Sequence, residues 1–106
     1  MSTSWIYLIA AILFEVSGTT CMKLSEGFTK LVPSVLIFVF YGLCFSFLTL
    51  ALKRLEVSVA YSVWAGLGTV LIAIIGIIWF RESATFTKVL SIALIIMGVI
   101  GINASK

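Results

Sequence analysis

A single carboxylate, Glu15, interrupts an apolar run that extends from Trp5 to Met22. No lysine, arginine or histidine lies between Met1 and Met22 to pair with it. An unpaired charge is costly in apolar surroundings, so we expect a proton or a bound cation to neutralise this one. One carboxylate that holds either, but not both together, can exchange one for the other. The structural alternative is a protonated acid that makes a hydrogen bond between helices.

Small side chains surround Glu15 if this run is helical. Ala11 at i−4, Gly18 at i+3 and Thr19 at i+4 lie on the same helix face as the carboxylate. We therefore expect these three residues to line a pocket beside Glu15. A simple helix-packing face would use the same small residues, and this is the alternative.

Aromatic residues could form the other walls of a cation site. Tyr61 and Trp64 are three residues apart and share a helix face, and Tyr41 lies near the middle of the preceding apolar run. Aromatic faces attract poorly hydrated cations. Because Tyr61 and Trp64 come early in their run, an aromatic belt at the membrane surface is the alternative.

Two glycines, Gly66 and Gly68, follow directly in the stretch AGLG. Glycines this close together weaken a helix and often mark a kink. A kink here could let the site open to alternate sides of a membrane. Close packing against a neighbouring helix is an equal alternative.

The composition identifies the environment that must position these residues. The chain has 106 residues, of which 62% are hydrophobic and 10% charged, and its mean hydropathy is +1.28. A soluble domain of this size is far more polar, so we expect an all-α integral membrane protein. Its N-terminus lacks the basic segment of a cleavable signal. A single membrane domain, 1–106, is expected to contain four spanning helices, at about 5–22, 32–52, 57–80 and 86–103.

The joining loops are short, so consecutive helices are expected to be antiparallel neighbours. Basic residues are then nearly balanced between the two sides of the membrane. The side of the termini carries Lys53, Arg54 and Lys106. The other side carries Lys23, Lys30, Arg81 and Lys88. A difference of one charge is too small to fix the orientation of the chain.

Four helices are too few to enclose both a bulky ligand and a pathway, so we expect the chain to oligomerise. A dimer would bring two copies of Glu15 to one cavity. Ser91 and Gly98 are seven residues apart on one face of the last helix, and we expect them at the dimer contact. Cys21 and Cys44 are expected to pack as small apolar residues. The sequence shows no nucleophile–base pair, metal-ligand cluster or phosphate loop, so we expect no catalysis, metal, cofactor or nucleic acid.

Two longer stretches carry a family resemblance. EVSGTTCMKLSEGFTKLVPS (15–34) and SVAYSVWAGLGTV (58–70), with ESA and GVIGIN near the end, resemble the small multidrug resistance family of bacterial exporters over essentially the whole chain. The resemblance implies an antiparallel homodimer of four-helix subunits in the bacterial inner membrane. It also implies that both copies of Glu15 are shared between protons and exported cations.

The resemblance assigns further roles by position. Ala11, Gly18 and Thr19 would line one side of the pocket, and Tyr41, Cys44, Tyr61 and Trp64 the other. Gly66 and Gly68 would mark the kink of the third helix, and Gly98 would belong to the dimer contact of the fourth. Three positions depart from the family pattern. Many members have Ser where this chain has Cys44, some multidrug members have Trp at Ser46, and Ser91 replaces a Gly.

The family has two main branches, which export either hydrophobic quaternary ammonium and aromatic cations or guanidinium. Gly18 stands where the guanidinium branch usually has Trp, and Asn103 where that branch tends to have Lys. A small residue at position 18 would leave room for a bulky ligand, so we interpret the chain as a multidrug exporter. A guanidinium exporter is one alternative, and an accessory membrane subunit without transport is another. The natural substrate, the proton stoichiometry and the need for an unlike partner chain stay open.

Overall fold

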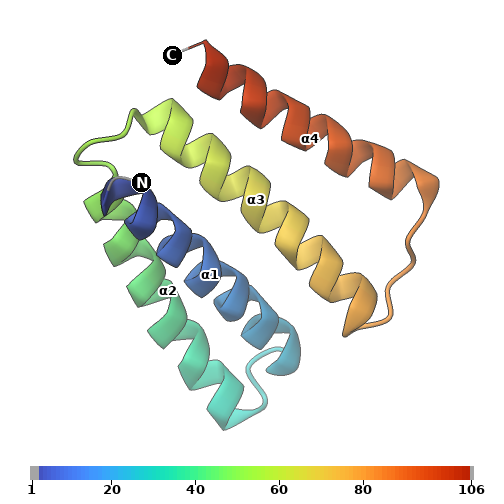
Figure 1. Ribbon diagram of the computed structural model, residues 1–106. Helices are drawn as coiled ribbons and strands as arrows, with labels where there is room; N and C mark the ends of the chain where they lie inside the picture. Colours follow the sequence, from blue (N-terminus) through green and yellow to red (C-terminus); the bar gives the residue numbers. More distant parts are fainter. Residues whose placement is uncertain (1–2, 106) are drawn as a thin grey trace.

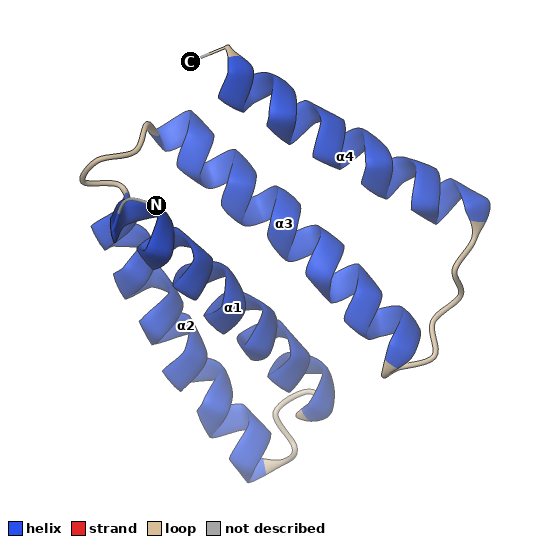
Figure 2. Cartoon of the chain, viewed as in Figure 1, coloured by secondary structure: helices blue, strands red, loops and turns tan. Residues whose placement is uncertain are grey.

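The computed structural model describes residues 3–105, which form four α-helices and no β-strand (Figures 1 and 2). The helices are α1 (Thr3–Leu24), α2 (Leu31–Ala51), α3 (Val57–Ile78) and α4 (Phe86–Ala104). The ends of the expected domain, Met1, Ser2 and Lys106, lie outside the described residues. Lys106, which was counted in the charge balance, is therefore known from the sequence alone.

All four helices are long and apolar enough to cross a membrane. They contain 19 to 22 residues, which at 1.5 Å per residue corresponds to about 28–33 Å. The hydrocarbon core of a bilayer is about 30 Å thick. The prediction of an all-α protein with four candidate membrane spans is therefore confirmed.

A tight turn connects α1 to α2 and reverses the direction of the chain. Three consecutive residues, Glu26, Gly27 and Phe28, have positive φ angles of 48°, 72° and 68°. The buried Ser25 holds this turn, because its hydroxyl donates to the carbonyl of Met22 at 2.9 Å and accepts from the backbone N–H of Phe28 at 3.2 Å. The side-chain bonds satisfy backbone groups at the helix end that would otherwise lack partners.

Helix α1 lies between α2 and α3, and α4 packs on α3 (Figure 1). The core that joins the first three helices contains Leu8, Ile12 and Val16 from α1 and Ala60 and Val63 from α3. The backbones of α1 and α2 and those of α3 and α4 approach closely, as expected of consecutive helices. Helices α2 and α3 meet instead through side chains, as at Phe45 and Trp64.

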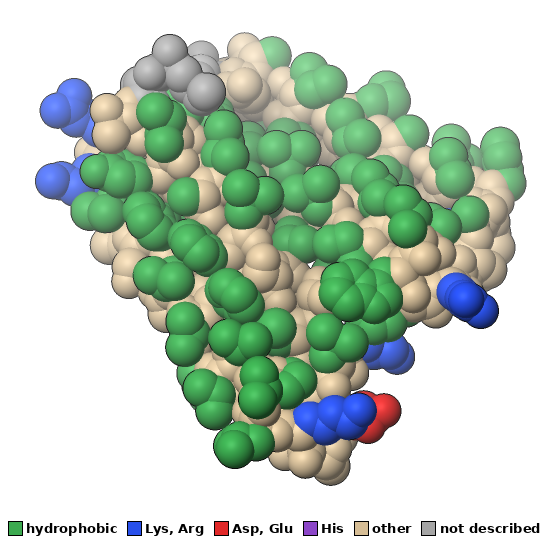
Figure 3. Space-filling model, turned by 60° about the horizontal axis from the view of Figure 1, so that its bottom comes forward, with side chains coloured by type: hydrophobic (Ala, Val, Ile, Leu, Met, Phe, Trp, Pro, Cys, Tyr) green, Lys and Arg blue, Asp and Glu red, His purple; other side chains and the backbone are tan. Residues whose placement is uncertain are grey.

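Helix α4 stands at the edge of the subunit. None of its described residues is buried, although Ile95 and Val99 point toward α3 at Gly66. Hydrophobic side chains cover the visible surface of the subunit, and the charged side chains gather near the helix ends (Figure 3). An apolar exterior of this kind matches a lipid environment or a contact with another membrane protein.

Candidate functional site

The carboxylate of Glu15 packs on the backbone of α3. Glu15 lies near the middle of α1 and is half-buried. A Cβ atom added at Gly68 would lie only 2.9 Å from Oε2 of Glu15. Because real Cβ contacts are longer than this, the missing side chain at Gly68 is what lets the carboxylate approach the helix.

A short hydrogen-bond chain holds the other carboxylate oxygen. The hydroxyl of Thr19 donates to Oε1 of Glu15 at 3.0 Å and lies 2.6 Å from the hydroxyl of Tyr41. Thr19 has one hydroxyl proton, so while it donates to Glu15 it must accept from Tyr41. The chain therefore runs from Tyr41 on α2 through Thr19 to Glu15 on α1.

A cavity of about 200 Å³ opens beside the carboxylate, between α1 and α3. It is lined by Glu15, Trp64, Ala65, Gly68, Thr69 and Ile72. The indole N–H of Trp64 is buried and has no hydrogen-bond partner among the described residues. The cavity thus combines a carboxylate with an aromatic side chain, and these are two groups that attract cations.

Aromatic rings extend from this cavity across α2 and α3. Tyr41 and Phe45 have ring centroids 6.0 Å apart, Phe45 and Trp64 are separated by 6.3 Å, and Trp64 meets Tyr61 edge-on at 5.2 Å. Phe45, which connects the two helices in this row, was not among the expected site residues. Its position four residues after Tyr41 is the sequence signal that could have found it. Tyr61 is 58% exposed in the subunit.

Three other expected pocket residues are buried in the packing of the subunit. Ala11 is fully buried and does not line the cavity. Gly18 lies under the ring of Tyr41, whose Cε2 would be 2.8 Å from a Cβ at position 18. The expected room for a ligand at Gly18 is therefore filled by Tyr41 within the subunit. Cys44 is fully buried next to Trp64.

The glycine pair of α3 permits close approach on two sides. Gly68 accommodates Glu15, and a Cβ at Gly66 would come within 2.5 Å of Cγ2 of Val99 on α4. Helix α3 continues through both positions from Val57 to Ile78. In this conformation both glycines allow close packing against neighbouring side chains. A hinge of α3 at Gly66 and Gly68 stays a prediction.

The two residues expected at a dimer contact have different surroundings. Ser91 lines a second, larger cavity between α1, α3 and α4, and its hydroxyl donates to the carbonyl of Thr87 at 2.7 Å. Gly98 is exposed, and a Cβ there would meet nothing within 4 Å. The surface at Gly98 is thus open for another helix to approach.

Glu15 has no basic partner among residues 3–105. The one salt bridge in this part of the chain joins Glu26 to Lys30 at 3.5 Å, on the surface of the α1–α2 turn. The basic residues lie in the loops and helix ends, far along the chain from the centre of α1. The charge of the carboxylate is therefore not neutralised within the described part of the subunit.

These features define a small multi-pass membrane protein with a carboxylate beside a cavity that Trp64 also lines. The chain belongs to the small multidrug resistance family, because the family model described as Small Multidrug Resistance protein matches residues 3–95. The resemblance seen in the sequence is confirmed, and with it a multi-pass location in a bacterial cell membrane.

Similar proteins support the same family. The chain is 56% identical over 100 residues to the membrane protein YvaE of Bacillus subtilis, with 94% of this chain and 84% of the relative covered. It is 47% identical to the quaternary ammonium compound-resistance protein QacF of Klebsiella aerogenes, covering 94% of this chain and 91% of the relative. It is 40% identical to the multidrug resistance protein EbrA of Bacillus licheniformis, covering 99% and 100%.

Proposed function

We propose that this chain exports hydrophobic and aromatic quaternary ammonium cations in exchange for protons. Glu15 binds either a proton or the organic cation, and alternating access exposes it to one side of the membrane at a time. The working unit is an antiparallel homodimer that contains two copies of Glu15.

The observation that carries this proposal is the unpaired state of Glu15. Within the described residues its carboxylate has a hydroxyl donor, Thr19, and a backbone contact at Gly68, but no cation. A hydroxyl stabilises a carboxylate without neutralising it. The neutralising charge must therefore come from outside the subunit, and a proton and an organic cation compete for the same two oxygens.

The residues around the cavity favour an organic cation as the substrate, because they offer a carboxylate and aromatic faces. A quaternary ammonium group has no N–H to donate, so a carboxylate and aromatic faces are the groups that can bind it. Trp64 lines the cavity with Glu15, and Phe45 and Tyr61 extend the aromatic surface. The names of the relatives QacF and EbrA, which refer to quaternary ammonium and multidrug resistance, agree with this substrate class.

Three features support a dimer with opposite orientations. The cavity beside Glu15 has about 200 Å³, which is below the roughly 300–1,000 Å³ typical of sites for drug-sized ligands. A second subunit would complete it. Helix α4 has no buried residue and presents the open surface at Gly98. The near balance of basic residues is compatible with insertion in both directions.

A growth assay with Glu15 variants tests the proposal. Cells that express the wild-type chain should tolerate a toxic quaternary ammonium compound better than cells that express Glu15→Ala. Glu15→Asp should keep part of the tolerance, because it retains a carboxylate. Membrane levels of each variant must be equal.

If Glu15→Ala protects as well as the wild type, the exporter proposal is wrong and an accessory subunit is favoured. If Glu15-dependent protection appears only against guanidinium, the proposed substrate class is wrong.

A further inference from the structure

A second cavity, more than twice the volume of the one at Glu15, lies between α1, α3 and α4. Its volume is about 430 Å³. Its deep end is apolar, with Ile72 and Ala73 from α3 and Ile92 and Ile95 from α4. Its mouth lies where α1 ends and α4 begins, at the end of the helices and therefore at the membrane surface.

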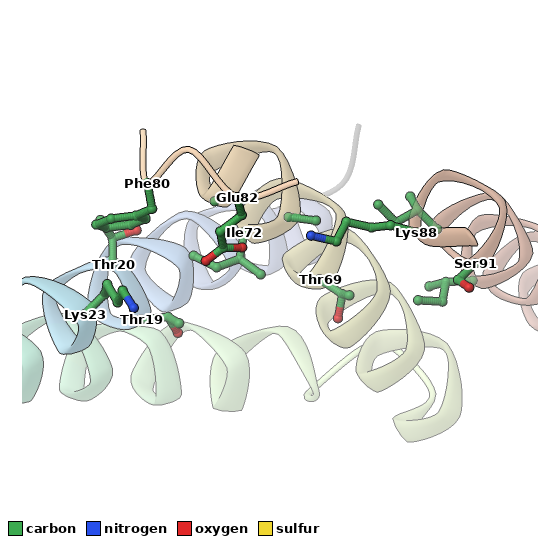
Figure 4. A pocket seen from close by; sticks show the side chains of 13 residues that line it. Thr19, Thr20, Lys23, Thr69, Ile72, Phe80, Glu82, Lys88 and Ser91 are labelled. Carbon is green, nitrogen blue, oxygen red and sulfur yellow. The ribbon is translucent and has the colours of Figure 1, made fainter. Parts of the chain in front are cut away.

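The mouth carries three charged side chains. Lys23 comes from the last turn of α1, Glu82 from the α3–α4 loop and Lys88 from the first turn of α4. Figure 4 shows Glu82 between Lys23 on one side and Lys88 on the other. No salt bridge within 4.0 Å joins Glu82 to either lysine in residues 3–105. The three charges are thus available to a ligand.

The backbone of Glu82 is bonded to α3, and its side chain lies against the same helix. Its backbone N–H donates to the carbonyl of Gly76 at 3.0 Å, and its side chain covers Gly76 so closely that a Cβ there would collide with Oε1. Gly76 is buried as a result. Glu82 thus places a negative charge at the cavity beside α3, between two positive ones.

Lys88 is placed where a bound anion would be favourable. It lies in the first turn of α4, where the helix dipole already contributes a partial positive charge and where no acidic residue is present. The hydroxyl of Thr85 already caps this helix end by accepting from the backbone N–H of Lys88 at 3.1 Å. A phosphate near Lys88 would therefore pair with the ammonium group of the lysine and gain from the helix dipole.

The charge pattern also excludes the cations proposed for Glu15. Two lysines and one glutamate give the mouth a net positive charge, which repels a lone organic cation. A ligand with one phosphate and one ammonium group fits the pattern, because the phosphate pairs with a lysine and the ammonium with Glu82. Basic pockets between transmembrane helices bind anionic lipid headgroups, and the carboxylate of Glu82 favours here a headgroup that also carries an ammonium group.

We propose that this cavity binds a zwitterionic aminophospholipid of the phosphatidylethanolamine class. The phosphate lies against Lys88 at the start of α4, the ammonium group lies against Glu82, and part of an acyl chain enters the apolar cavity between α3 and α4. Lys23, on the other side of Glu82, adds to the positive potential at the mouth. The lipid would fill the space that separates α4 from α1 and fix the position of the edge helix.

Native mass spectrometry of the purified protein tests this site. The wild type is mixed in detergent with phosphatidylethanolamine or with phosphatidylglycerol, and the lipid retained per subunit is counted. We expect retention of phosphatidylethanolamine to fall by about tenfold in Lys23→Gln/Lys88→Gln. The matched control is Lys30→Gln/Arg81→Gln, which removes two charges from the same side of the membrane but none from the cavity, and it should retain the lipid.

A single substitution tests the role of the carboxylate. Glu82→Gln should remove the preference for phosphatidylethanolamine over phosphatidylglycerol, because phosphatidylglycerol has no ammonium group to pair with Glu82. Equal retention by the two double variants would overturn the proposal. Displacement of the lipid by inorganic phosphate alone would also overturn it, because the site would then recognise free phosphate. The proposal would also be overturned if the wild type formed a dimer without retained lipid and Lys23→Gln/Lys88→Gln made that dimer dissociate. A second copy of the chain would then fill the cavity.

Discussion

The carboxylate of Glu15 rests on the backbone of α3 at Gly68, with Oε2 only 2.9 Å from the place where a Cβ would stand. This contact joins the one ionisable residue in the centre of α1 to the glycine pair of α3. Any movement of α3 along α1 would change the surroundings of the carboxylate. The relationship therefore couples the proposed binding residue directly to the helix that forms the cavity wall.

Gly68→Ala should weaken cation binding and transport while leaving the fold intact. The added Cβ would push the carboxylate away from α3 and disturb its bond to Thr19, whereas alanine itself favours a helix. We expect the affinity for a bulky aromatic phosphonium, measured by calorimetry, to fall at least about tenfold, in keeping with the loss of a charge-assisted contact. Gly42→Ala is the control, because a Cβ at Gly42 meets nothing within 4 Å. Equal affinity of the two variants would contradict the proposed role of Gly68.

The hydroxyl of Thr19 should matter for transport because it is the side-chain donor to Glu15. Thr19→Val keeps the shape and removes the hydroxyl, so we expect a fall in transport rate of about tenfold, whereas Thr19→Ser should retain most activity. Tyr41→Phe should have a smaller effect, because Tyr41 acts on Glu15 through Thr19.

A double-mutant cycle tests this chain of bonds. In the double variant Thr19→Val/Tyr41→Phe, the transport rate should be no lower than in Thr19→Val alone, since the hydroxyl of Tyr41 then has no acceptor at Thr19. Rates can be followed by uptake of the radiolabelled cation into vesicles. Fully additive effects would show that Tyr41 acts independently of Thr19.

The sequence was sufficient to predict the architecture, and the physical reason is the bilayer. Four long apolar segments separated by short charged loops can only be spanning helices. The order of packing was harder to predict. Loop length indicates that α2 and α3 are neighbours, but the closest backbone packing of both helices is with α1, and α2 meets α3 through side chains such as Phe45 and Trp64.

The site was predicted in part. The i+4 spacing of Glu15 and Thr19 correctly placed them together, because helix geometry fixes that distance. The closeness of Gly68 and Tyr41 to this pair depends on how three helices pack, which no local spacing determines. For the same reason the ring of Tyr41, rather than open space, lies over Gly18. Phe45 was missed although it lies one turn after Tyr41.

Gly66 should affect the stability of the fold, whereas Gly68 should affect cation binding. A Cβ at Gly66 would overlap with Cγ2 of Val99, so Gly66→Ala should destabilise the contact of α3 with α4 by about 1–3 kcal/mol. Val99→Ala removes the obstructing methyl groups and should rescue Gly66→Ala. Thermal unfolding in detergent, followed by circular dichroism, measures both effects. If Val99→Ala worsens Gly66→Ala instead, the two side chains are not in the contact described.

The open surface at Gly98 should serve subunit association. Gly98→Leu leaves the subunit unchanged, because the site is empty for at least 4 Å, but it would obstruct an approaching helix. At a low ratio of protein to lipid in vesicles, we expect energy transfer between donor-labelled and acceptor-labelled subunits to be several-fold lower for Gly98→Leu than for the wild type. Gly42→Leu is the control, since it adds the same side chain to an equally open position on α2. A dimer unaffected by Gly98→Leu would place the contact on another face.

The most direct test of the central claim is the proton movement that a cation gradient drives through this protein alone in liposomes. A gradient of a bulky aromatic phosphonium is applied with the same starting pH on both sides, and a pH-sensitive dye inside the liposomes reports the movement of protons. Glu15→Gln provides the blank, because it preserves size while removing the charge. Proton movement opposite to the cation in the wild type, absent from Glu15→Gln, is the predicted result, and it would establish exchange through Glu15 without a second kind of chain. Absence of this proton movement in folded wild-type protein would contradict the proposed exporter of aromatic cations.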